Sequence, residues 1–103
     1  MAYFAIHCLD KPMAADLRAA TRPAHLEHLQ RHAGQVFAAG PLIGPDGEVI
    51  GSLIIVDMPD RDAAYRFAAE DPYALAGLFQ SVAVTAWRKV IPADIPPAAV
   101  ALG

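Results

Sequence analysis

The stretch Val49-Ile-Gly-Ser-Leu-Ile-Ile-Val56 decides the fold of this chain. Five of its eight residues are β-branched, and such residues favour the extended backbone of a strand. A second apolar run at residues 35–42 precedes it, and the turn-forming sequence IGPDGE at 43–48 joins the two runs. Two strand-forming runs with turn formers between them predict an antiparallel hairpin in the middle of the chain.

One further strand is expected on each side of this hairpin. Residues 2–9 (AYFAIHCL) are apolar and aromatic and are followed by Asp10 and Pro12, which suits a short buried strand better than a helix. Residues 81–91 alternate between two faces, and one of these faces carries Trp87. The sequence therefore predicts four strands in all.

The interval between the first two strands has helical composition. Residues 13–20 are rich in alanine, which favours a helix, but Pro23 lacks the amide that a continuing helix needs. We therefore expect a break at Pro23 and a second helical piece over 23–33. In that piece Leu26 and Leu29 recur at helical spacing and form the apolar stripe that packs inward.

The interval after the central hairpin predicts a second helix and a short third one. Asp60 is suited to the N-cap position, and Phe67 belongs to an inward-facing apolar stripe. Asp71 before Pro72 is a second N-cap signal, because proline is favoured at the first helical position. This second signal predicts a short helix over 72–79.

The order strand, helix, strand, strand, helix, strand predicts an α+β fold of the ferredoxin-like βαββαβ kind, with both helices on one face of an antiparallel sheet. The other face needs a cover, because it includes Trp87, whose full burial is worth about 2 to 3 kcal/mol. A second copy of the chain, packed sheet to sheet, supplies it, so we expect a homodimer. The domain is expected to span residues 1–91, and residues 92–103 to form a C-terminal arm.

Composition indicates one folded domain and argues against two kinds of partner. With 55% hydrophobic and 18% charged residues, the chain is far from the composition of disordered segments. The net charge is −3 and the basic residues are scattered, so nucleic acid is not an expected partner. No apolar stretch approaches the roughly 20 residues that cross a bilayer, so membrane insertion is not expected either.

Cysteine and glycine usage argues against a disulfide, a metal and a nucleotide cofactor. Cys8 is the only cysteine, which suggests a reducing, cytoplasmic location, and no Cys pair or Cys/His run has zinc spacing. Gly44, Gly47 and Gly51 precede a strand and not a helix, so they do not form a phosphate-binding loop. We expect neither a metal nor another cofactor, and an inert Cys8.

Three histidines are the first candidates for chemistry. His25, His28 and His32 are spaced i, i+3 and i+7, which places them on one side of a helix. Imidazole titrates near neutral pH, so the alternatives are a general base, a metal triad, or a partly solvated polar flank. Three histidines on one rigid helix converge poorly on one ion, so His28 and His32 are assigned to the solvated flank. His25 is nearest to the apolar stripe and is the candidate base.

Four other residues are candidates for a pocket beside His25. Asp71 is a helix cap, and it could also hold a histidine in the tautomer whose second nitrogen acts as a base. Ser52 is either a pocket hydroxyl or an ordinary strand residue, and Arg22 is either an anion contact or a surface charge. Tyr73 is grouped with Arg22 and Ser52 as a substrate-binding candidate, although such aromatic residues more often serve packing.

Several short motifs together resemble a known family. They are Arg22-Pro-Ala-His-Leu26, Gly40-Pro41, Gly51-Ser52 and Asp71-Pro-Tyr73, followed by Gly77 and a closing strand. In this combination and order the chain resembles the YciI-like (YCII-related) family, from the first strand to Ile91. The RPAHL and DPY motifs at this separation carry most of the resemblance.

The resemblance implies a dimeric α+β barrel and a His-Asp pair in a pocket, which would fall on His25 and Asp71 with Ser52 and Arg22 beside them. It implies a small-molecule enzyme of the lyase, isomerase or dehydrochlorinase type, since a relative eliminates chloride from a hydroxyquinone. In this hypothesis His25 removes a proton from a small cyclic or aromatic compound. Two alternatives stay open: a non-catalytic module that binds a small ligand or modulates a partner, and a cofactor-independent monooxygenase.

Overall fold

The structure is a computed structural model that describes residues 2–92. Its elements follow the predicted βαββαβ order, and the predicted short helix after Asp71 is present but ends at Leu75, earlier than expected. They are β1 (Ala2–Asp10), α1 (Ala15–Arg31), β2 (Val36–Ile43), β3 (Val49–Met58), α2 (Arg61–Glu70), α3 (Pro72–Leu75) and β4 (Phe79–Trp87). The α+β, ferredoxin-like fold class is therefore confirmed. Of the predicted C-terminal arm, residues 93–103 lie outside the described part of the chain.

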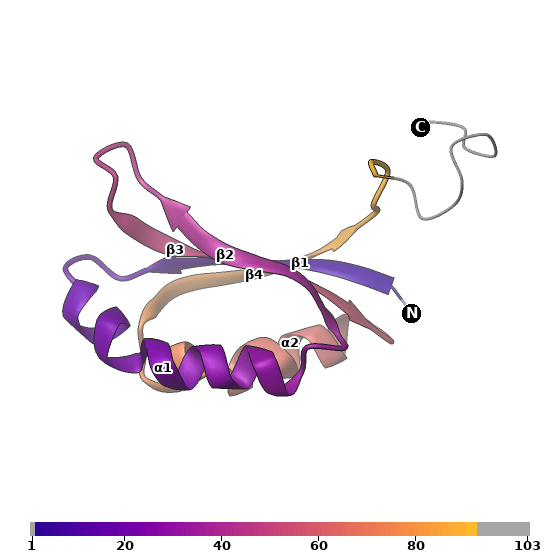
Figure 1. The fold of residues 1–103 in the computed structure, drawn as a ribbon, viewed down its shortest axis with the longest axis horizontal. Helices are drawn as coiled ribbons and strands as arrows, with labels where there is room; N and C mark the ends of the chain where they lie inside the picture. Colours follow the sequence, from indigo (N-terminus) through magenta and orange to yellow (C-terminus); the bar gives the residue numbers. More distant parts are fainter. Residues whose placement is uncertain (1, 93–103) are drawn as a thin grey trace.

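The four strands form one antiparallel sheet in the order β2-β3-β1-β4. Ile6 at the centre of β1 is opposite Ile54 of β3 on one side and Val84 of β4 on the other. The first and last strands of the domain are thus neighbours, as the ferredoxin-like order requires. Figure 1 shows α1 and α2 side by side beneath the sheet, so both helices cover the same face.

The core lies between this face of the sheet and the two helices. Because side chains alternate along a strand, every second residue of β1 and β3 points toward the helices. The buried core residues are Phe4, Ile6, Cys8, Ile54, Val56, Met58, Ala64, Phe67, Ala68 and Val84. The central strands β1 and β3 therefore supply six of these ten core residues.

The start of α2 has the predicted cap. The side chain of Asp60 accepts a hydrogen bond from the backbone N–H of Ala63, with a donor–acceptor distance of 2.8 Å. The predicted inward stripe is also present, since Ala64, Phe67 and Ala68 are buried. Strand β4 begins at Phe79 and ends at Trp87, so it starts earlier and ends earlier than expected.

The predicted break at Pro23 is wrong, because α1 runs without interruption from Ala15 to Arg31. Proline removes one N–H, so only the carbonyl of Ala19 loses its intrahelical donor. Pro23 itself is exposed, and its ring displaces no core residue. The side chains of Arg18 and His25 bind other elements on either side of Pro23, and these contacts hold one helix across it.

The predicted inner stripe of α1 is also partly wrong. Leu29 packs on the core, but Leu26 is 37% exposed, whereas His25 and His28 are buried. A single helix buries only the face that meets its neighbours, and here that face is rotated toward the two histidines. Polar side chains can take such positions when hydrogen bonds or ring stacking replace water.

The face of the sheet opposite the helices carries a cluster of three aromatic rings. Tyr3 lies 5.4 Å from Phe37 and 5.7 Å from Trp87, measured between ring centroids. In Figure 1 neither α1 nor α2 covers this face. Between residues 2 and 92, none of the helices is long and apolar enough to span a bilayer.

Candidate functional site

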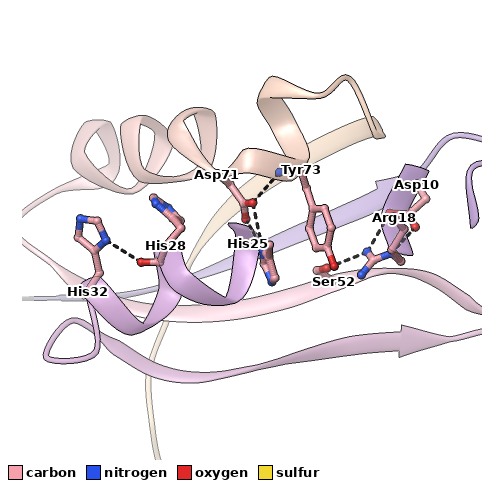
Figure 2. Close-up of polar contacts among 8 residues, drawn as sticks. All are labelled: Asp10, Arg18, His25, His28, His32, Ser52, Asp71 and Tyr73. Carbon is pink, nitrogen blue, oxygen red and sulfur yellow. Dashed lines mark hydrogen bonds and ion pairs between the residues drawn. The ribbon is translucent and has the colours of Figure 1, made fainter. Parts of the chain in front are cut away.

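His25 and Asp71 are in direct contact, although 46 positions separate them along the chain. The Nδ1 atom of His25 lies 2.9 Å from Oδ1 and 3.0 Å from Oδ2 of Asp71. His25 projects from the middle of α1, and Asp71 lies between α2 and α3 (Figure 2). His25 is 7% exposed and Asp71 2% exposed, so the pair is largely shielded from water.

Local sequence explains why the carboxylate points at the helix. Asp71 ends α2 and begins α3, with Pro72 in the first turn, and its Oδ1 accepts a hydrogen bond from the N–H of Tyr73 at 2.9 Å. The cap thus fixes the orientation of the carboxylate independently of its contact with His25. A carboxylate only accepts hydrogen bonds, so Nδ1 of His25 is the donor, and in the neutral form of the imidazole Nε2 carries the lone pair.

Tyr73 forms a wall of the site. Figure 2 shows its ring between His25 and Arg18. The ring of His25 stacks on it with a centroid distance of 4.1 Å, and the guanidinium carbon of Arg18 lies 4.5 Å from its centroid. Tyr73 is only 1% exposed, and burial raises the pKa of its phenol. A tyrosine that stays protonated can donate a hydrogen bond at neutral pH.

Arg18 is a site residue that the sequence motifs did not identify. Its Nε and Nη2 atoms donate to the two carboxylate oxygens of Asp10 at 2.7 and 3.0 Å, and Nη2 also donates to Oγ of Ser52 at 2.9 Å. Burial disfavours its charge, but hydrogen bonding to Asp10 and its negative charge raise the Arg18 pKa above the ordinary value. Arg18 stands seven residues before His25, so helical spacing from the candidate base is the signal that would have found it.

These side chains surround a cavity of about 330 Å³ between α1 and the β2–β3 half of the sheet. This volume is at the lower end of the range for small-molecule pockets. The lining consists of Arg18, Arg22, His25, Leu26, Leu29, Ala39, Gly40, Pro41, Val49, Ser52, Ile54 and Tyr73. The structure therefore brings together four of the predicted site residues on one cavity, and the fifth, Asp71, lies behind His25.

Arg22 and Ser52 take different places in this cavity. Ser52 is 3% exposed and bound to Arg18, so it belongs to the closed inner part of the lining. Arg22 is exposed on the next turn of α1. It therefore stands where the cavity meets solvent.

His28 and His32 lie outside the cavity lining, but the assignment of His28 to a solvated flank is wrong. His28 is 3% exposed and stacks on Phe67 at 4.6 Å between ring centroids. Burial lowers the pKa of His28, while the charge of Asp71 and a hydrogen bond to the backbone of Phe67 act against that shift. His32 donates through Nδ1 to the carbonyl of His28 at 2.9 Å, on the side away from the cavity (Figure 2).

Cys8 is not among the residues that line the cavity. Cys8 is buried, and burial together with the charges of Asp71 and Asp10 raises the pKa of its thiol to about 12, so it carries almost no thiolate at neutral pH. Across residues 2–92, no three His, Cys, Asp or Glu side chains gather as metal ligands would. The polar chemistry of the cavity rests on imidazole, guanidinium and hydroxyl groups.

Comparisons with known sequences agree over most of the chain. A family model described as the YCII-related domain matches residues 2–88. Protein YciI of Escherichia coli is 33% identical over 95 residues, which cover 84% of this chain and 97% of that protein. An uncharacterised protein of Haemophilus influenzae is 32% identical over 96 residues, covering 85% and 98% of the two chains.

Solved structures agree with this relationship. The 5-chloro-2-hydroxyhydroquinone dehydrochlorinase from Burkholderia phenoliruptrix, in complex with 2,5-dihydroxybenzoquinone, superimposes with a TM-score of 0.78 at 28% identity, covering 84% of this chain and 93% of that one. An antibiotic biosynthesis monooxygenase shares the fold, with a TM-score of 0.52 at 18% identity over 87% and 99% of the two chains. Since the family model spans nearly all of the described residues, the chain belongs to the YCII-related family.

Proposed function

We propose that this protein is a small-molecule enzyme in which His25, held by Asp71, acts as a general base on a cyclic or aromatic compound. The observation that carries the proposal is the pairing of His25 Nδ1 with Asp71 at 2.9 Å beside a cavity that His25 lines. With Nδ1 engaged, Nε2 is the ring nitrogen available to a ligand. An oriented imidazole in a largely apolar cavity is suited to proton abstraction.

The reaction class that fits is a lyase, isomerase or dehydrochlorinase. In an elimination, the ring first tautomerises to its keto form, in which one hydroxyl proton is exchanged for a proton on the ring carbon that carries the leaving group. Nε2 of His25 then takes a proton from a second ring hydroxyl, the oxygen electrons form a C=O bond, the adjacent double bond shifts to that carbon, and the leaving group departs with its bonding pair. The buried carboxylate of Asp71 stabilises the imidazolium that forms. In an isomerisation the same nitrogen would return the proton to another ring position.

The structural relative supports a ring substrate. That enzyme is a dehydrochlorinase, and its ligand, 2,5-dihydroxybenzoquinone, is a planar six-membered ring with several oxygens. The present cavity combines apolar walls from Leu26, Leu29 and Ile54 with the polar groups described above, and its volume suits one such ring. Halogenated hydroxyquinols are therefore the first substrates to test.

We also propose that the protein acts as a homodimer in the cytoplasm. The sheet face away from the helices carries the Tyr3, Phe37 and Trp87 rings, and Phe37 is 44% exposed in the single chain. A second copy placed on this face would remove that apolar area from water, which is the main gain in most stable association. A small-molecule ligand and a second copy are thus the proposed partners.

The test is chloride release from 5-chloro-2-hydroxyhydroquinone and related compounds. We expect His25→Ala to lower kcat/KM at least about 100-fold, because general-base catalysis contributes about that much. Asp71→Asn should lower it less and shift the pH dependence, since the amide still fills the space but no longer stabilises an imidazolium. His32→Ala is the matched control and should retain activity, because His32 lies outside the cavity lining.

Unchanged turnover in His25→Ala would remove the base assignment. Ligand binding without turnover would favour the non-catalytic module, and oxygen consumption in the same screen would favour the monooxygenase alternative. Chloride release that depends on His25, binding without turnover, and oxygen consumption thus distinguish the three functions.

A further inference from the structure

The cavity has a second polar end, built around Arg18, that the proposed base does not use. One edge of the guanidinium, Nε and Nη2, donates two hydrogen bonds to Asp10 of β1, and Nη2 also donates to Ser52 of β3. The Arg18 side chain is 11% exposed and that of Asp10 8% exposed. An arginine held by two strands in this way has lost most of its rotamer freedom, so its position relative to the cavity is set before a ligand arrives.

The charges of the lining are all positive. Arg18 and Arg22 line the cavity, whereas none of its lining residues is a carboxylate. The two carboxylates near the site, Asp10 and Asp71, lie behind Arg18 and His25 and are not part of the lining. A ligand in the cavity therefore meets cationic and neutral donors first, which favours a negatively charged oxygen over a cation.

The spacing of the base and the guanidinium suits a single ring. The imidazole centroid of His25 and the guanidinium carbon of Arg18 lie 4.1 and 4.5 Å from the centroid of the same ring, Tyr73. A single six-membered ring with oxygens at two of its corners can therefore reach both groups. Tyr73, stacked on His25 and under Arg18, forms the wall along which such a ring would lie (Figure 2).

We infer that Arg18, positioned by Asp10 and Ser52, binds an anionic oxygen of the ligand, so that the cavity selects ionised phenols and enols over neutral rings of the same shape. The inference rests on the proposed function only in taking the ligand to be a ring compound. When His25 removes a proton, negative charge develops on the ring oxygens, and a preorganised guanidinium stabilises that charge. Exposed Arg22 would attract the anion to the entrance.

The experiment compares two probes that differ in charge. 4-Nitrophenol ionises near neutral pH, whereas 4-nitroanisole has nearly the same shape and cannot ionise. Binding of each to the full chain is measured by calorimetry at a pH at which the phenol is ionised. We expect the phenolate to bind at least about tenfold more tightly, in line with the strength of charge-assisted hydrogen bonds.

Arg18→Met should abolish this preference while leaving the affinity for 4-nitroanisole unchanged within about twofold. Arg31→Met removes one positive charge from the exposed end of α1, outside the cavity lining, and should keep the preference. Because Arg18→Met leaves Asp10 buried without its partner, the double variant Asp10→Asn/Arg18→Met is measured as well. The double variant should also lack the preference.

Three results would overturn the inference: equal affinity of the wild type for both probes, no binding of either probe at millimolar concentration, or a preference that survives in both Arg18 variants. A preference lost only in Arg22→Met would assign the anion contact to Arg22 instead. Chloride release is a separate readout. A protein that prefers the phenolate but releases no chloride contradicts the proposed reaction and leaves the anion site standing.

Discussion

His28 is 3% exposed on the inner face of α1, and its Nε2 atom is buried without a hydrogen-bond partner among the described residues. Its neighbours are the rings of Phe67 and His32, and the charged groups Asp71 and Arg31 act on it from α2–α3 and from its own helix. Protonation would place a charge in this poorly hydrated position. His28 therefore makes the stability of the fold sensitive to pH.

The direction of this sensitivity follows from the lowered pKa of His28. Burial puts the folded-state pKa below the ordinary value of about 6.5, so the unfolded chain takes up the proton first as the pH falls. The contribution of neutral His28 is complete above pH of about 6.5 and is lost as the pH falls below it. We expect His28→Gln to lose less stability than the wild type between pH 7.5 and pH 5, measured by urea unfolding. Equal losses would contradict this expectation.

Helix α1 contains Pro23 in its interior and continues through it without a break. Pro23 is exposed and lies between two anchored side chains, Arg18 and His25. Pro23→Ala restores an N–H for the carbonyl of Ala19, so we expect the free energy of unfolding to rise by about 1 to 3 kcal/mol. Urea unfolding measures the change. A destabilised variant would mean that the proline ring shapes α1 in a way the cavity needs.

The pairing of β1 with β3 depends on one glycine. Gly51 is opposite Leu9, and a Cβ at this position would overlap the carbonyl oxygen of Cys8. Gly51→Ala should therefore force the strands apart and destabilise the fold by about 3 kcal/mol or more. Gly34→Ala is the matched control, because a Cβ there meets nothing within 4 Å. Equal thermal unfolding midpoints for the two variants would contradict this prediction, because they would mean that β1 and β3 can move apart with little loss of stability.

At the scale of the whole molecule, the sheet has one face covered by helices and one face without them (Figure 1). Ala5 lies near the middle of the uncovered face, opposite Ile55 of β3 and Thr85 of β4. In the proposed dimer this position is buried, so Ala5→Arg should convert the dimer to a monomer that keeps its circular dichroism spectrum. Ala69→Arg, on the exposed side of α2, should leave the dimer intact. Sedimentation velocity distinguishes the two states, and a monomeric wild type would refute the dimer.

The sequence by itself determined the features that depend on neighbouring residues. The β-branched run at Val49–Val56 and the turn at 43–48 predict the hairpin, and the Asp60 and Asp71-Pro72 caps predict where α2 and α3 begin. Capping and strand propensity act over a few residues, so they can be recognised without coordinates. The family motifs added the pairing of His25 with Asp71 as an expectation.

Only the tertiary structure decided how distant residues meet and which side of α1 faces inward. Helical spacing allows several inner faces, and packing on the sheet selected the one that buries His28 and exposes Leu26. The Arg18–Ser52 contact joins residues 34 positions apart, and the cavity exists only because α1 lies across β2 and β3. Burial and long-range contacts depend on all elements at once, whereas a local pattern constrains only the segment that contains it.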